Sequence, residues 1–349
     1  MKAARDGETM QVPSTEGFEA YWYFASERHQ IYLRKLAGQH GSLTRDPVIA
    51  ENRFTNAYRA ADRVSQYLIR WVQYNQDWSW ADTFARTLLF KVFNRIDTWQ
   101  HLVAQIGEPN ADLILDRSVD QALAKIAGAR PIYSAAYIMP PPRTSSGPKY
   151  VRHLDLIRAM LRDQAHLRVQ ASPSMAGAFR TLASYPSIGA FLAYQFVTDL
   201  NYSVHLSFSE QEFVVAGPGA RRGIKKCFAD SGAHSHEYLI RWTLEQQHSA
   251  FEQRGLMWSG LWGRDLQLVD IQNLFCEVDK YTRVALPELA RFAPGTRIKQ
   301  RYRPNPLPIR AWFPPKWGIN ERVSLPLTLE DDGPPVLSTR RRPTVPVST

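Results

Sequence analysis

The chain has 349 residues and a formal net charge of +10, with 43 Lys and Arg residues against 33 Asp and Glu residues. This length suffices for one large domain or two lobes, and the positive excess favours a polyanionic partner such as DNA. The two cysteines, Cys227 and Cys276, exclude a disulfide framework and a four-cysteine zinc or iron–sulfur site. No apolar run approaches the roughly 20 residues that span a bilayer, so we expect a cytoplasmic protein without membrane contact.

Apolar residues recur at helical spacing along most of the chain, and strand patterns are scarce. We expect a flexible N-terminus at 1–15 and a tail rich in proline and arginine at 316–349. The helical domain between them, 16–315, is predicted to form two lobes, 16–140 and 150–315, because the prolines after Met139 interrupt the helices. Helices are expected at about 17–37, 56–74, 80–103, 117–127, 151–168, 173–184, 190–201, 217–230, 234–254 and 269–291. The predicted fold class is therefore mainly α.

A tight turn at Pro186-Ser187-Ile188-Gly189 separates two of these helices. The surrounding pattern of apolar residues, proline and glycine is typical of a helix-hairpin-helix, in which the turn's backbone N–H groups bind a DNA phosphate. We therefore assign Gly189 to DNA binding. An ordinary corner between two packed helices is the alternative for this pattern.

A second glycine-rich turn opens the helix expected at 217–230 and is followed by basic residues. It lacks the lysine and hydroxyl of a nucleotide-binding P-loop, which argues against a kinase. Backbone N–H groups at a helix start, together with nearby cations, indicate phosphate binding. The candidate DNA contacts here are Gly217, Gly219, Arg221, Arg222, Gly223 and Lys225.

Two carboxylates close to these turns are candidate catalytic groups. Asp199 lies near the end of the helix after the hairpin, and Glu212 is expected at the N-cap of the next helix. A fixed carboxylate beside a scissile glycosidic bond stabilises an oxocarbenium-like transition state. A salt-bridged acid at Asp199 and a plain helix cap at Glu212 are the alternatives.

A pocket for an extruded base is expected from aromatic and polar residues elsewhere in the chain. Asp270, Asn273, Glu277 and Tyr281 follow one another at spacings of three and four, which gives one helix a polar face. Such a face on a partly buried helix indicates a ligand pocket or, alternatively, a buried salt-bridge network. The predicted base pocket comprises Tyr194, Gln195, Tyr202, Trp258, Asp270, Asn273 and Glu277. We expect no metal and no cofactor, because the His234-x-His236 pair has no cysteine pair nearby.

Four segments together resemble one family. They are Arg53 to Arg59, Phe191 to Tyr202, Phe213 to Gly223, and Asp270 to Tyr281. They resemble the helical, DNA-glycosylase-like family of α-glutamyl/putrescinyl thymine pyrophosphorylases and 5-hydroxymethyl-deoxyuridine (5-hmdU) DNA kinase helical domains, and the resemblance covers about residues 16–304. That family is linked to hypermodified bases of phage DNA. Some members resemble amino-acid:DNA transferases, and a bacterial one resembles a defence glycosylase acting on α-glucosyl-hydroxymethylcytosine.

The resemblance implies a two-lobed, DNA-glycosylase-like fold and a double-stranded DNA partner that carries modified phage bases. We expect a monomeric, monofunctional glycosylase in antiviral defence that flips out a bulky modified pyrimidine, excises it and leaves an abasic site. Asp199 or Glu212 would supply its catalytic carboxylate. Phe191 stands where bifunctional relatives carry a Schiff-base lysine. The alternatives are a transferase that adds an amine or amino acid to an activated hydroxymethyl pyrimidine, and a non-enzymatic reader of modified DNA.

Overall fold

The computed structural model describes residues 12–39, 41–135, 139–142, 146–294, 297–298, 300–304 and 309–323. Within these ranges the chain is mainly helical and has no β-strand, which confirms the predicted class. No helix in this part of the chain is both long enough and apolar enough to cross a membrane. The α-helices are α1 (Glu16–Leu36), α2 (Pro47–Glu51), α3 (Arg63–Tyr67), α4 (Trp80–Phe93), α5 (Ile96–Ile106), α6 (Ala111–Leu115), α7 (Ser118–Ala129), α8 (Lys149–Arg162), α9 (Ala165–Gln170), α10 (Met175–Ala183), α11 (Ala190–Leu200), α12 (Pro218–Cys227), α13 (His236–Glu245), α14 (Gln247–Gln253) and α15 (Leu268–Ala285).

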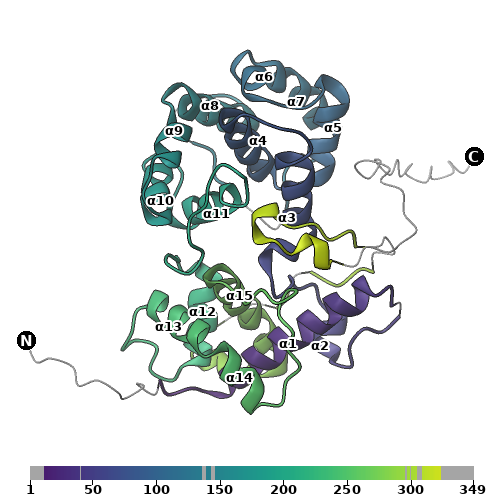
Figure 1. The fold of residues 1–349 in the computed structure, drawn as a ribbon, viewed down its shortest axis with the longest axis vertical. Helices are drawn as coiled ribbons and strands as arrows, with labels where there is room; N and C mark the ends of the chain where they lie inside the picture. The colour runs from purple at the N-terminus through teal and green to yellow at the C-terminus, as the bar shows by residue number, and fades with distance from the viewer. Residues whose placement is uncertain are drawn as a thin grey trace, which may run out of the picture.

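The helices gather in two regions in Figure 1. The helices from α4 to α11 lie in the upper half of the view, and α1, α2 and α12 to α15 lie in the lower half. The N-terminal helix α1 packs on α12, α14 and α15, although the predicted boundary would place it in the other lobe. The division into lobes at 140–150 remains a prediction.

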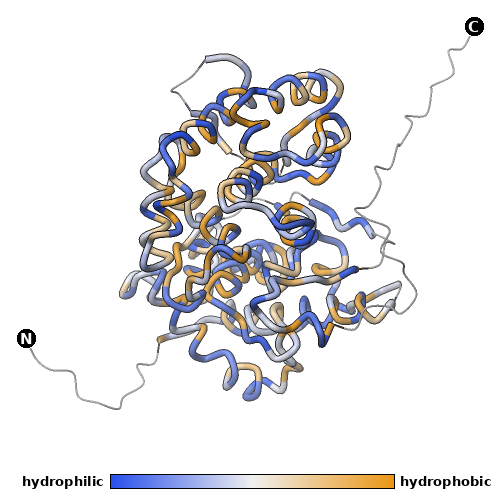
Figure 2. Tube along the Cα trace, turned by 45° about the horizontal axis from the view of Figure 1, so that its top comes forward, coloured by the Kyte–Doolittle hydropathy of each residue, from blue (hydrophilic) through white to orange (hydrophobic). Residues whose placement is uncertain are grey.

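The lower region is built around α15, which packs on α1, α12 and α13. Aromatic rings fill the space between these helices: the centroid of Phe275 lies 4.5 Å from that of Tyr21 and 6.1 Å from that of Phe228. Apolar and hydrophilic residues alternate along the helices (Figure 2), as expected where one face of each helix is buried.

Several of the predicted helices are interrupted, among them the one expected at 234–254, which divides into α13 and α14. Asn94 (φ 48°) and Gln164 (φ 52°) adopt the left-handed conformation, so the helices expected at 80–103 and 151–168 each divide into two. Asparagine tolerates this conformation better than most residues. The helix expected at 56–74 is a loop followed by three short segments: η1 (Arg59–Ala61), α3 and the π-helical η2 (Leu68–Gln73).

Two short helices were not predicted. Asp46 caps α2 by accepting a hydrogen bond from the N–H of Ile49 at 2.9 Å, and Asn110 caps α6 through the N–H of Leu113 at 2.9 Å. The signal was present in the sequence, because Asp-Pro and Pro-Asn pairs favour turns and helix starts. Helices of five residues show too little periodicity to reveal themselves otherwise.

The segments predicted to be flexible at the two ends of the chain extend too far into the folded domain. The backbone N–H of Thr15 donates to the Cys227 carbonyl at 2.9 Å, and Val12 is buried, so 12–15 is an ordered part of the domain. At the other end Phe313 is buried, and two short helices follow, η4 (Pro315–Trp317) and η5 (Asn320–Arg322). Large aromatic side chains order this segment despite its prolines. The rest of the predicted termini, 1–11 and 324–349, lies outside the described residues.

Candidate functional site

The two glycine turns predicted to bind phosphate lie next to each other. Gly189 is the N-cap of α11, and Gly217 is the N-cap of α12. A Cβ atom added to Gly217 would come within 2.8 Å of the Phe191 ring, which places the ring against the start of α12. Phe191 itself is 37% exposed. Two helix N-termini and an exposed aromatic ring therefore form one continuous patch.

The cations of α12 point in different directions. Arg221 and Lys225 are exposed, and the Nε atom of Arg221 donates to the Ala216 carbonyl at 3.0 Å. Arg222 is partly exposed and pairs with Asp279 of α15 at 2.9 Å. Lys226 is buried and pairs with the same carboxylate at 3.0 Å. Arg221 and Lys225 are thus the α12 cations that face solvent.

Gly219 and Gly223 lie where α12 crosses α15. A Cβ on Gly219 would be 2.3 Å from the Sγ atom of Cys276, and one on Gly223 would be 1.9 Å from the Phe275 carbonyl oxygen. Only glycine allows two helices to approach so closely. Close packing therefore accounts for both glycines, and their assignment to DNA binding remains a prediction.

Asp199 lies at the centre of a buried ion cluster. Its carboxylate is fully buried and pairs with the Arg59 guanidinium at 2.7 Å and the Lys91 ammonium at 3.3 Å. Arg59 also donates to Tyr202 at 3.0 Å and to Gln195 at 3.1 Å. Burial opposes ionisation of Asp199, yet the two cations hold its pKa below the ordinary value. Three predicted site residues, Gln195, Asp199 and Tyr202, therefore meet around Arg59.

The polar face of α15 holds the loop that contains Arg59. Asp270 accepts the backbone N–H of Arg59 at 2.8 Å, and burial raises the pKa of Asp270 to about 6. Glu277 accepts the N–H of Thr55 at 3.1 Å, and Asn273 donates to the Thr55 hydroxyl at 3.0 Å. The buried network, rather than an open ligand pocket, accounts for these contacts.

The predicted pocket aromatics do not converge on one place. Tyr194 is buried and packs edge-on against Phe213, with ring centroids 5.9 Å apart. Trp258 stacks on Phe251 at 4.2 Å and lies 5.8 Å from Tyr58, in the lower region of the fold. The two side chains therefore do not line one common pocket. Their assignment to a base pocket remains a prediction.

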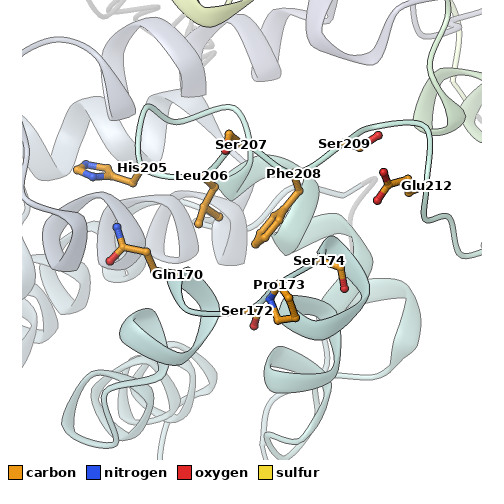
Figure 3. Close-up of a pocket in the computed structure, with 10 residues that line it drawn as sticks. All are labelled: Gln170, Ser172, Pro173, Ser174, His205, Leu206, Ser207, Phe208, Ser209 and Glu212. Carbon is orange, nitrogen blue, oxygen red and sulfur yellow. The ribbon is translucent and has the colours of Figure 1, made fainter.

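Glu212 borders an open pocket of about 430 Å³ between the α9–α10 connection and the loop at 205–212 (Figure 3). Its expected position at a helix N-cap is wrong, because the next helix begins only at Pro218. The extended stretch 213–217 contains two valines, which favour extended backbone over a helix. The sequence analysis missed the other lining residues: Gln170, Ser172, Pro173, Ser174, His205, Leu206, Ser207, Phe208 and Ser209.

The C-terminal segment supports the wall of this pocket. The ammonium of Lys316 donates to the carbonyls of Ser203 at 3.1 Å and Leu206 at 2.6 Å, and also to that of Asn201. Burial lowers the pKa of Lys316 to about 8. No sequence motif marked this lysine, because it lies in a segment that was expected to be an unstructured tail.

Residues 15–291 match the family described as "5-hmdU DNA kinase, helical domain". This chain belongs to that family. It is also similar to the 5-hmdU DNA kinase of Bacillus phage SP10, with 24% identity over 322 residues, 86% of this chain and 50% of the phage protein. The chain thus spans about half the length of that relative. No solved structure matches the chain.

These matches overturn the predicted chemistry. A kinase transfers a group, whereas a glycosylase hydrolyses a bond, so the expectation of a base-excising hydrolase is wrong. Without glycosidic-bond cleavage, the expected roles of Asp199 and Glu212 at such a bond no longer apply. The comparison supports the transferase alternative better, while the expected role in antiviral defence and the monomeric state remain predictions.

Proposed function

We propose that this chain is a transferase that binds DNA, recognises a 5-hydroxymethyl pyrimidine in it and transfers a group to that base. The observation that carries the proposal is the family match over residues 15–291, together with the similarity to a 5-hmdU DNA kinase. The net charge of +10 supports a polyanionic partner.

The relative's name favours phosphoryl transfer, although the turn at 217–223 of this chain lacks the lysine and hydroxyl of a P-loop, so a nucleoside triphosphate would bind elsewhere. In that reaction the hydroxymethyl oxygen attacks the terminal phosphorus of a nucleoside triphosphate. A new O–P bond forms, the bond to the diphosphate leaving group breaks, and the hydroxymethyl proton passes to a base or to water. Attachment of an amine or amino acid to an already activated hydroxymethyl group is the second transfer reaction. A modified-DNA reader, which would bind without transferring anything, is the non-enzymatic alternative.

We place the DNA backbone at the patch formed by the starts of α11 and α12, in the manner of a helix-hairpin-helix within a two-lobed fold. Backbone N–H groups at the start of α11 suit phosphate. At the start of α12, where Pro218 has no N–H, the exposed Arg221 and Lys225 supply positive charge. Phe191, between the two starts, offers a ring for contact with a sugar or base.

The binding test compares surface variants at two places. Arg221→Ala and Lys225→Ala should each weaken binding to any duplex and lower the salt-dependence slope by about one unit. Arg162→Ala on α8 and Lys125→Ala on α7 make the same chemical changes at exposed positions in the other region of Figure 1. Fluorescence anisotropy across a salt series measures both effects. Equal slopes for test and control variants would exclude α12 from the DNA contact.

The chemical test incubates the full chain with a duplex containing 5-hmdU and with ATP, followed by digestion to nucleosides and mass spectrometry. Gain of a phosphoryl group on the modified base supports the proposal. An unchanged base with tight, modification-dependent binding supports the reader, and loss of the base would refute group transfer altogether.

A further inference from the structure

The pocket beside Glu212 has the size and position of a receptor for one nucleoside. Its volume of about 430 Å³ lies within the range of about 300 to 1,000 Å³ that is usual for small-molecule sites. Small serine side chains at 172, 174, 207 and 209 line it, and the Phe208 ring points from the loop toward Pro173 (Figure 3). A flat aromatic ring beside hydroxyl groups suits a planar base with polar edges.

The walls of the pocket are held in place before any ligand arrives. The side chain of Asn201 accepts the Phe208 N–H at 2.9 Å and donates to the Phe208 carbonyl at 3.0 Å. Lys316 binds the carbonyls of the same loop, and His205 contacts the Trp78 carbonyl at 3.1 Å. A pre-formed site of this kind binds its ligand without the cost of ordering a loop.

Several polar groups in the pocket have no partner within the described part of the protein. They are the Glu212 carboxylate, the Gln170 amide and the Ser207 hydroxyl, all on exposed residues and therefore open to water or to a ligand. No lysine or arginine is among the described lining residues. Arg241, outside the lining, donates to the backbone carbonyls of Gln211 and Glu212 and not to the Glu212 carboxylate. These features favour a neutral ligand that donates a hydrogen bond, and they disfavour a phosphate.

We propose that this pocket receives an extruded 5-hydroxymethyl pyrimidine, with Glu212 accepting a hydrogen bond from the hydroxymethyl O–H. The inference rests on the proposed function. The DNA-binding patch proposed there, at the starts of α11 and α12, lies beyond the end of α10 that is farther from the pocket. Ten residues separate Ser174 at the pocket from Ser184 at the hairpin, or about 15 Å of helix. That length equals about four base steps of one DNA strand, so the distance from the hairpin to the pocket is compatible with one bound duplex.

The same charge explains how substrate and product would be distinguished. The hydroxymethyl base is neutral, whereas a phosphorylated base carries a charge of about −1.5 to −2 at neutral pH. Glu212 would repel that phosphate, so the pocket binds the group before transfer and releases it afterwards. Thymine lacks the hydroxyl and leaves Glu212 without its hydrogen bond.

The test measures anisotropy with three duplexes that differ at one base: 5-hmdU, thymine, and the phosphate ester of 5-hmdU. The quantity compared is the ratio of Kd values for each protein. Glu212→Gln should reduce the preference for 5-hmdU over thymine about tenfold and narrow the discrimination against the phosphate ester. Ser207→Leu, which fills the pocket from an exposed position, should remove the preference. Glu252→Gln on α14 and the exposed Ser146→Leu are matched controls.

The outcomes separate the pocket from the function. If the wild type prefers 5-hmdU and both pocket variants keep the full preference, the pocket assignment is refuted while the proposed function stands. If the wild type binds all three duplexes equally, recognition of the modified base fails and the inference falls with it. Circular dichroism melting of each variant shows whether a lost preference reflects unfolding.

Discussion

The crossing of α12 and α15 makes a strong prediction about one methyl group. In Gly223→Ala the new Cβ atom would lie 1.9 Å from the Phe275 carbonyl oxygen and 2.7 Å from its carbon. Even a close C···O contact needs about 3.3 Å. Because the obstructing atoms are backbone, no rotamer change relieves the clash, and the two helices must separate by more than about 1 Å.

Two opposing terms set the size of the effect. Overpacking a well-packed site costs typically about 1 to 3 kcal/mol, and a backbone clash belongs at the upper end. Replacing glycine by alanine inside a helix gains up to about 1 kcal/mol. We therefore expect Gly223→Ala to lower the free energy of unfolding by about 2 kcal/mol.

Gly128→Ala in α7 is the matched control, because nothing lies within 4 Å of the position its Cβ would occupy. This variant should be as stable as the wild type or more stable by up to about 1 kcal/mol. Urea unfolding followed by circular dichroism measures both, and unchanged m-values would show that the unfolded states are comparable. If Gly223→Ala proves as stable as Gly128→Ala, the close helix crossing is wrong.

Three further predictions follow from buried charges. Asp199→Asn leaves Arg59 and Lys91 uncompensated and should cost about 3 to 5 kcal/mol of unfolding free energy in urea, whereas the exposed Asp77→Asn should change it by less than about 0.5. Lys316→Met removes three hydrogen bonds to loop carbonyls and should both lower stability by about 2 kcal/mol and weaken the preference for 5-hmdU in anisotropy. The pKa of Asp270 is raised from 3.8 to about 6, so the folded state holds an extra proton between these values and this contribution to stability is lost as the pH rises through 6. In Asp270→Asn the fall in unfolding free energy between pH 4 and 6 should be shallower by up to about 1.4 kcal/mol per pH unit; an unchanged slope would contradict the raised pKa.

Periodicity predicted the long helices well, because α1, α4, α8 and α15 each bury one apolar face over many residues. It could not predict their interruptions. Gln164 adopts a positive φ and so separates α8 from α9. This is a property of one residue's backbone, and the spacing of apolar residues does not reveal it. The order of the 309–323 segment was equally hidden, because it depends on Trp317 and Phe313 meeting rings from distant parts of the chain.

The sequence predicted several residues of the candidate site, but it did not predict which of them lie together in the fold. The residue types around Arg59 were noticed, yet their burial as an ion cluster depends on helices that are far apart in sequence. The pocket was represented only by Glu212, since serine-rich loops have no periodic pattern and resemble any solvent-exposed connection. The chemistry was misjudged because the resemblance joined glycosylases and transferases, and because the missing P-loop lysine at 217–223 was taken as evidence against a kinase.

The organisation of α12 shows how one short segment combines residues that pack on α15 with cations that face solvent. Positions 219, 223 and 226 follow helical spacing and face α15, where two glycines permit close contact and Lys226 neutralises the buried Asp279. Arg221 and Lys225 are four residues apart, so they share the opposite face and point to solvent. The two faces of α12 therefore have different compositions. Small residues on one face allow close packing on α15, and cations on the other face are exposed to solvent. A helix anchored so closely presents Arg221 and Lys225 in fixed positions, which is what a defined phosphate contact requires.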